Sequence, residues 1–194
     1  DLVPNGFKIF WYKPARAYAG IFFRHQFISY EFFNQELTWS LAGTPPTGMV
    51  LDSKTGVLTW SNPISGVYTL QVEVTRAAGA SLSFSFTLNV SQDTQKFLFV
   101  DPAGNDTSQG TYSAPFKTIQ HALQVAASRQ SGLTIYVASG TYNEHSNGVG
   151  SGVLSVSRSY SAEDPLIISG YSKSSQTGTE RFTLDCGGAN SDYR

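Results

Sequence analysis

The sequence contains little cysteine and little charge. Cys186 is the single cysteine among 194 residues, so no disulfide can form within the chain, and a lone cysteine is more often a small core residue than a nucleophile. Charged residues make up 14% of the chain, against about 25% in ordinary soluble domains. The net charge is −1 without a basic patch, which argues against nucleic acid as a partner. No apolar run approaches the roughly 18 residues that cross a bilayer, so we expect no membrane span.

Glycine, serine, threonine and aromatic residues take the place of the missing charges. Aromatic residues alone make up 13% of the chain. This mixture suits strands that are joined by tight turns and have uncharged outer faces. Low charge together with strands rich in serine and threonine indicates an exported protein, located outside the cell or at its surface.

Short segments of alternating polarity fill the first half of the chain. They are bounded by Gly, Pro, Ser or Asp, and their spacing predicts a β-sandwich that ends near Val90. Trp39 and Trp60 stand at alternating positions, where we expect core residues rather than sugar-stacking ones. Two longer segments each place a set of apolar side chains on one face: Tyr68, Leu70, Val72 and Val74 in the first, and Leu82, Phe84, Phe86, Leu88 and Val90 in the second.

One stretch of this region carries a recognisable pattern, "LTWSLAGTPPTGMVLDSKTGVLTWSNPISGVYTLQVEV". It resembles the immunoglobulin-like, cadherin-like modules of bacterial surface and secreted proteins over residues 14–92. The acidic calcium-ligand motifs of true cadherins are missing, so the resemblance implies no calcium here and a role as a spacer, adhesion unit or accessory domain. The matching positions are Pro46, Gly48, Met49, Leu51, Asp52, Thr55, Gly56, Leu58, Trp60, Gly66, Tyr68 and Val72.

A different pattern follows the polar linker 91–95. "VDPAGNDTSQGTYSAPFKTIQHA" is followed in order by "IYVASGTYNE". Over residues 96–186 the two blocks resemble the N-terminal start of right-handed parallel β-helix proteins of the pectate-lyase-like superfamily. We therefore expect an all-β chain, with an Ig/cadherin-like β-sandwich in 14–92 and the helix-capped start of a right-handed parallel β-helix in 96–194.

One amphipathic segment, 115–128, interrupts the strands of the second half. Pro115 suits a first helical turn. The first coil of a β-helix exposes an apolar end and unpaired strand groups, so we expect the helix to cover that end as a cap. Its apolar side chains share one face at helical spacing: Phe116, Ile119, Ala122, Leu123 and Ala126.

A glycine-containing loop groups Asp101, Asn105 and Asp106. Carboxylate and amide oxygens are the ligands that calcium prefers, so this loop could hold calcium, and we expect no other cofactor. The alternative is that these side chains hydrogen-bond the turn itself. One loop supplies few oxygens for a closed shell, which favours the alternative.

The remaining titratable residues suggest no catalytic set. His25, His121 and His145 show no metal-ligand spacing, so we expect structural roles for them. Glu144 and Asp185 could act as an acid or base, or as turn residues at coil corners. In the β-helix enzymes that the second half resembles, the chemistry lies on later coils, and we assign no catalytic residue.

Two triplets match the N-glycosylation sequon, one at Asn89 and one at Asn105. Such triplets often arise by chance, so modification is the less favoured reading.

The N-terminal arm, residues 1–13, is unusually apolar. A patch of this kind is rarely left exposed. The arm either forms a strand of its own sandwich or docks on a neighbouring copy, and we expect docking because residues 14–92 could form the sandwich without it. The side chains expected to drive assembly are Phe7, Ile9, Phe10, Trp11 and Tyr12.

Two functions are compatible with these features. The first is the N-terminal portion of a secreted or cell-surface β-helix protein that binds or acts on polysaccharide and is not catalytic by itself. The second is a structural subunit of an extracellular fibre or surface layer, assembled from further copies through the arm and the open β-helix end.

Overall fold

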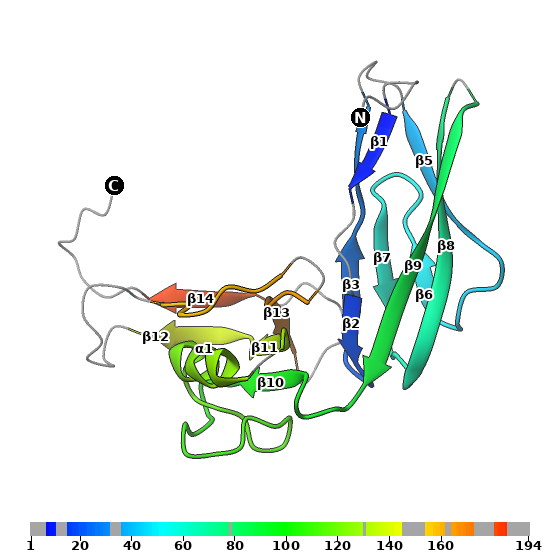
Figure 1. The fold of residues 1–194 in the computed structure, drawn as a ribbon. Coiled ribbons are helices and arrows are strands. Elements are labelled where there is room, and N and C mark those ends of the chain that lie inside the picture. Colours follow the sequence, from blue (N-terminus) through cyan, green and yellow to red (C-terminus); the bar gives the residue numbers. More distant parts are fainter. Residues whose placement is uncertain are drawn as a thin grey trace, which may run out of the picture. The chain divides into compact units, whose positions relative to one another are not determined.

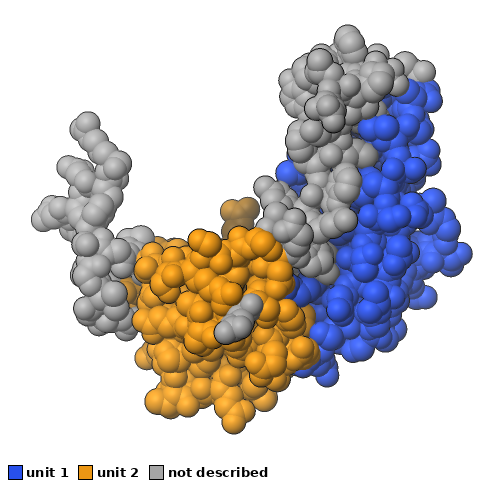
Figure 2. All heavy atoms as spheres, viewed as in Figure 1, with its two compact units in different colours: residues 1–92 blue, residues 93–194 orange. Residues whose placement is uncertain are grey.

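The strands of the computed structural model fall into two groups along the chain (Figure 1). The model describes residues 7–10, 15–31, 36–77, 79–129, 131–144, 154–161, 164–172 and 181–185. Two compact units divide the chain, residues 1–92 and residues 93–194, coloured blue and orange in Figure 2. Within the described residues the one helix is α1 (Ile119–Ser128), so the expected all-β class is confirmed. No helix of the described residues is long and apolar enough to cross a membrane.

Unit 1 contains two sheets, which pack around one core, and in addition a separate pair of strands. The larger sheet has the order β2-β9-β8-β5, the smaller has the order β3-β7-β6, and β1 pairs with β4. All neighbours are antiparallel except β2, which runs parallel to β9. The strands are β1 (Phe7–Phe10), β2 (Ala15–Tyr18), β3 (Phe23–Gln26), β4 (Ile28–Glu31), β5 (Leu37–Ala42), β6 (Met49–Leu51), β7 (Val57–Trp60), β8 (Gly66–Arg76) and β9 (Ser81–Ser91).

Aromatic side chains fill the space between the two sheets. The ring of Phe27 stacks on Trp39 at 5.9 Å between centroids and meets the edge of Phe86 at 5.1 Å. Trp39 and Trp60 are 4% and 1% exposed, which confirms that they are core residues. The inward alternation expected for β8 and β9 is also confirmed, because their buried residues are Leu70, Val72, Val74, Phe84, Phe86, Leu88 and Val90.

Residues of the N-terminal arm pair within their own unit. Strand β1 runs antiparallel to β4, with Phe7 opposite Glu31 and Phe10 opposite Ile28. This is the first of the two alternatives for the arm, and it corrects the preference for docking as far as the backbone of Phe7–Phe10 is concerned. Trp11 and Tyr12 lie outside the described residues.

Unit 2 stacks its strands in parallel. β10 pairs with β11, and β11 with β13, in one sheet, whereas β12 pairs with β14 in another. The chain thus returns to the same sheet at intervals, as expected for the start of a parallel β-helix. The strands are β10 (Phe97–Val100), β11 (Thr134–Ala138), β12 (Gly140–Asn143), β13 (Ile167–Tyr171) and β14 (Phe182–Asp185).

Helix α1 packs its apolar face onto this stack. Its buried apolar residues join those of β10 and β11 in one core, so α1 shields the apolar side chains at the beginning of the stack, as expected for a cap. The core consists of Leu98, Val100, Phe116, Ile119, Ala122, Leu123, Ala126, Leu133, Ile135, Val137 and Tyr142.

The helix begins later than its sequence pattern predicts. Thr118 is the N-cap, with φ −115° and ψ 145°, and its side chain accepts a hydrogen bond from the backbone N–H of His121. Pro115 and Phe116 therefore precede the helix, and Phe116 forms an isolated parallel bridge with Val100. The expectation that Pro115 occupies the first helical turn is wrong, because a threonine side chain in extended backbone is a strong N-cap.

Candidate functional site

Two acidic side chains of unit 2, those of Asp106 and Glu144, converge on the N-terminus of α1. The carboxylate of Glu144, just after β12, accepts hydrogen bonds from the backbone N–H groups of Ile119 at 2.8 Å and Gln120 at 3.2 Å. Glu144 is 5% exposed. A buried carboxylate at this position satisfies two of the four free N–H groups of the helix and is favoured by its dipole. The structure thus gives Glu144 a capping role.

Asp106 supports the segment directly before the helix. Its Oδ1 accepts hydrogen bonds from the N–H groups of Lys117 at 2.8 Å and Thr118 at 2.9 Å, and its Oδ2 accepts one from the hydroxyl of Thr118 at 2.8 Å. The N-cap residue is therefore held by a carboxylate 12 positions earlier in the chain. Asp106 and Glu144 together fix where α1 begins.

The other two members of the predicted calcium group stabilise their own turns. Asp101 Oδ1 accepts a hydrogen bond from the N–H of Ala103 at 2.9 Å, and Asn105 Oδ1 accepts from both the N–H and the hydroxyl of Thr107 at 2.9 Å. The described residues contain no group of three or more His, Cys, Asp or Glu arranged to hold a metal ion. These hydrogen bonds are the ones that the favoured alternative predicts, and calcium binding by this loop is untested.

The packing of the loop before α1 requires glycine at position 110. Gly110 has a φ of +69°, and a Cβ at this position would overlap the ring of Phe116. The N–H of Phe99 donates to the carbonyl of Gly110 at 2.9 Å, and the N–H of Phe116 donates to that of Phe99 at 2.9 Å. The loop therefore lies against the first strand, and a side chain at residue 110 would push it away.

Two tyrosines lie buried near Asp101. The hydroxyl of Tyr142 donates to the carbonyl of Ala138 at 2.9 Å and lies 3.3 Å from that of Val100. Burial raises the pKa of Tyr142 and of Tyr171 well above the usual range, and the charge of Asp101 adds to this effect. Both phenols stay protonated at neutral pH, so they act as hydrogen-bond donors or packing groups rather than as bases.

The histidines of the described residues lie among aromatic rings. His25 packs against Phe27 at 4.8 Å and Phe86 at 5.0 Å between centroids, and burial lowers its pKa to about 4. His121 meets the ring of Phe116 at 4.6 Å. These surroundings fit the structural roles expected for both, whereas His145 lies outside the described residues.

The two sequons occupy different settings. Asn89 is an exposed residue near the end of β9, opposite Val67 of β8. Asn105 is exposed in the loop, with its side-chain oxygen engaged by Thr107. Glycosylation at either position stays a prediction.

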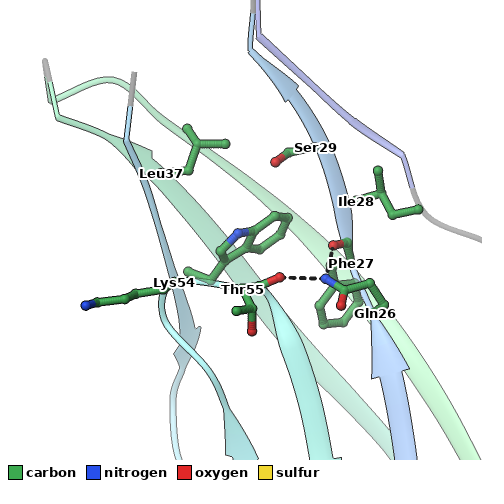
Figure 3. A pocket seen from close by; sticks show the side chains of 8 residues that line it. Gln26, Phe27, Ile28, Ser29, Leu37, Lys54 and Thr55 are labelled. Atoms are coloured by element: carbon green, nitrogen blue, oxygen red, sulfur yellow. Dashed lines mark hydrogen bonds between the residues drawn. The ribbon is translucent and has the colours of Figure 1, made fainter. Parts of the chain in front are cut away.

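A pocket of about 390 Å³ opens in unit 1 next to the N-terminal end of β7 (Figure 3). It lies between β4 and β5 and is closed at one end by the turn between β6 and β7. The Gln26 side-chain amide donates to the carbonyls of Thr55 at 2.5 Å and Phe27 at 2.9 Å. Sequence reasoning missed this pocket. Its lining is Gln26, Phe27, Ile28, Ser29, Leu37, Trp39, Lys54 and Thr55.

Two family models match the chain. Residues 24–91 match the family described as "Putative Ig domain", and residues 102–150 match the family described as "Protein of unknown function (DUF1565)". The first match lies within unit 1, and the second runs from the loop before α1 to just beyond β12.

Similar proteins share only parts of the chain. A Bacillus subtilis (strain 168) protein described as "Uncharacterized protein YwoF" is 42% identical over 48 residues, which is 25% of this chain and 10% of that protein. The first two repeats of human protocadherin-24 match with 8% identity and a TM-score of 0.37, over 47% of this chain and 49% of the other. A Bacteroides fragilis protein titled a "putative alpha-galactosidase" matches with 15% identity and a TM-score of 0.40, over 68% and 28%.

The chain therefore spans 10% of the curated relative and 49% and 28% of the two solved chains, and these two structural matches have TM-scores too low to establish a common fold. The family matches are similarities of segments: an Ig-like domain in the first unit and a DUF1565 segment in the second. The two matches together indicate a surface-associated domain.

Proposed function

We propose that the two units form a non-catalytic, polysaccharide-binding part of a secreted or cell-surface β-helix protein of the pectate-lyase-like type. The carboxylates of Asp106 and Glu144 are engaged in capping α1, which is a structural use of acidic residues. The parallel strand pairs of unit 2 support the β-helix part of the proposal. The Ig-like match supports a location outside the cell.

The observation that carries the binding proposal is the outer face of the β5-β8-β9 sheet. The outward positions of these three strands are rich in hydroxyl and amide groups, and Glu73 is the one charged side chain among them, whereas Arg16 of the neighbouring β2 lies opposite Asn89. Neutral sugars are recognised through hydrogen bonds to such groups, without the desolvation of charges. The outward polar residues are Thr38, Ser40, Thr69, Gln71, Glu73, Thr75, Ser81, Ser83, Ser85, Thr87 and Asn89.

Retention of the pure chain on insoluble xylan, cellulose and pectin tests the proposal. The Gln71 amide donates to the Ser85 hydroxyl at 2.6 Å across two strands of this face. Replacing both residues with alanine is expected to weaken retention at least about fivefold, whereas Thr59→Ala on the other sheet should leave it unchanged. Equal retention of all variants, or none by the parent chain, would count against the proposal. Release of reducing or unsaturated sugar ends would show that the chain is itself catalytic.

The second candidate is a subunit of an extracellular fibre. Among the described residues, β13 has one strand neighbour, β11, and its other edge carries no strand. Ile168 on β13 is 42% exposed. Open strand edges favour pairing with another chain. Electron microscopy of the pure chain would then show filaments, and Ile168→Lys should shorten or abolish them. A monodisperse monomer at all concentrations would exclude this candidate.

A further inference from the structure

The segment that joins unit 1 to unit 2 is held at both of its ends. In unit 1, β9 runs to Ser91, whose carbonyl accepts a hydrogen bond from the N–H of Ala19 at 3.1 Å. In unit 2, directly before β10, the carbonyl of Lys96 accepts one from the N–H of Thr134 at 2.9 Å. The expected polar linker is thereby shortened to residues 92–95.

Most of this linker is folded into a turn over residues 93–96. The N–H of Lys96 donates to the carbonyl of Asp93 at 3.0 Å, and the N–H of Gln95 donates to Oδ1 of Asp93 at 2.9 Å. An aspartate whose side chain bonds the backbone two residues later is a common way to begin a turn. The turn leaves Gln92 as the linker residue that lies outside it.

Arg129, which directly follows α1, ties the turn to unit 2. Its Nη1 donates to the carbonyls of Thr94 at 2.8 Å and Gln95 at 3.0 Å. Hydrogen bonds from a charged donor are stronger than those between neutral groups. Burial lowers the pKa of the Arg129 guanidinium and the charge of Asp93 raises it, so the aspartate that begins the turn is also attracted to Arg129.

The backbone of Arg129 is itself fixed. Arg129 is the C-cap of α1, and its N–H donates to the carbonyl of Ala126 at 3.2 Å. Its carbonyl accepts a hydrogen bond from the guanidinium of Arg158. Ala126 belongs to the core of unit 2. The turn is thus connected through one side chain to the helix that packs on this core.

Gln92 is held by no comparable contact. It is exposed, and no hydrogen bond joins it to another residue in the described part of the chain. Each residue has two soft backbone dihedral angles, so one free residue is enough to let the chain bend. It adds at most about 3.5 Å of reach, whereas four free residues, 92–95, would add roughly 14 Å.

We propose that Arg129 is a strap that holds residues 93–95 on unit 2, so that the linker bends at Gln92 alone. Hinges are commonly a few residues at the end of an element, which absorb the change in φ and ψ, and Gln92 directly follows β9. The strap therefore limits the reach of the linker. The proposal rests on hydrogen bonds within unit 2 and does not depend on polysaccharide binding.

The test measures backbone order parameters of the full chain by ¹⁵N relaxation. We expect rigid values of about 0.85 at Thr94, at Gln95 and in β10, and a value below about 0.6 at Gln92. Arg129→Met keeps an aliphatic side chain but removes the donors, and it should lower the values at Thr94 and Gln95 below about 0.6. The control Lys117→Met removes a positive charge from an exposed position near the other end of α1 and should change neither value.

A second variant keeps the test informative if Arg129→Met disturbs α1. Asp93→Ala removes the acceptor of the Gln95 N–H and the charge that attracts Arg129, without changing the helix, and it should also lower the order parameter of Gln95. A flexible Gln95 in the parent chain, a rigid Gln92, or order parameters that stay high in both variants would overturn the proposal. So would an equal loss of order in the control variant.

Discussion

Replacing Glu144 with glutamine should destabilise unit 2 and leave unit 1 unchanged. The buried carboxylate accepts from the N–H groups of Ile119 and Gln120 at 2.8 and 3.2 Å. An amide has one oxygen, so one of these N–H groups would face an NH₂ group instead. A hydrogen bond to a charged acceptor contributes about 1.5–3 kcal/mol, and an unsatisfied buried donor costs about 1–3 kcal/mol. Since these effects overlap, we expect a loss of about 2–4 kcal/mol.

Two spectroscopic signals report on different units, so the unfolding of each unit can be followed in one experiment. The three tryptophans, at positions 11, 39 and 60, all belong to unit 1, so their fluorescence reports on that unit. α1 is the one helix of the described residues, and helical circular dichroism therefore follows unit 2. In a unit of about 100 residues the expected loss lowers the melting temperature of the helical signal by at least roughly 8 °C.

The matched control for this substitution is Glu73→Gln, on the outer face of β8. It removes the same charge from a partly exposed position on the sheet surface and should change stability by less than about 0.5 kcal/mol. If Glu144→Gln leaves the helical transition unchanged, or shifts the tryptophan transition equally, the capping role is refuted.

Three further outcomes are expected. Leu123→Asp places a charge on the buried face of α1 and should lower the melting temperature of unit 2 and its solubility, whereas Gln124→Asp on the exposed face should not; equal behaviour of the two would contradict the cap assignment. Unit 1 should lose stability as the pH falls from 6.5 toward 4, because His25 keeps its ordinary pKa in the unfolded chain but has a pKa of about 4 when folded; a His25→Leu variant with the same pH dependence of tryptophan fluorescence would disprove this. Calcium should leave the helical melting temperature unchanged, since the loop oxygens of 101–106 accept hydrogen bonds from the chain; a rise that EDTA reverses would establish the calcium site instead.

The strand faces and the cap helix could be predicted because they depend on local spacing. Alternation along β8 and β9 identifies which side chains face inward, and the helical spacing of Ile119, Ala122 and Leu123 identifies the buried face of α1. The start of α1 depends in addition on Asp106, which lies 12 positions before Thr118. Contacts of this kind are invisible to a periodicity argument.

The capping role of Glu144 could have been inferred from the sequence. The two blocks matched in the second half of the sequence are joined directly, because the glutamate that ends the second block caps the helix that begins in the first. Two motifs that recur in fixed order suggest a contact between them. The pocket in unit 1 had no such signal, since it exists only because the β3–β7 ladder ends at Phe27.

Two residues that bond the start of α1, Glu144 and Ser155, lie far along the sequence from the helix, so during synthesis the helix is made before these partners. The carboxylate that closes the N-terminus of α1 comes 25 residues after Ile119, and the Gln120 side chain bonds the backbone of Ser155, which is 35 residues away. At about 5–20 residues per second, a ribosome needs roughly 1 to 5 s to extend the chain from the helix to Glu144. Through that interval the helix lacks its distant partners while the whole of unit 1 has already been made. The helix therefore reaches its full stability only after the residues that complete the first turn of the stack have been made.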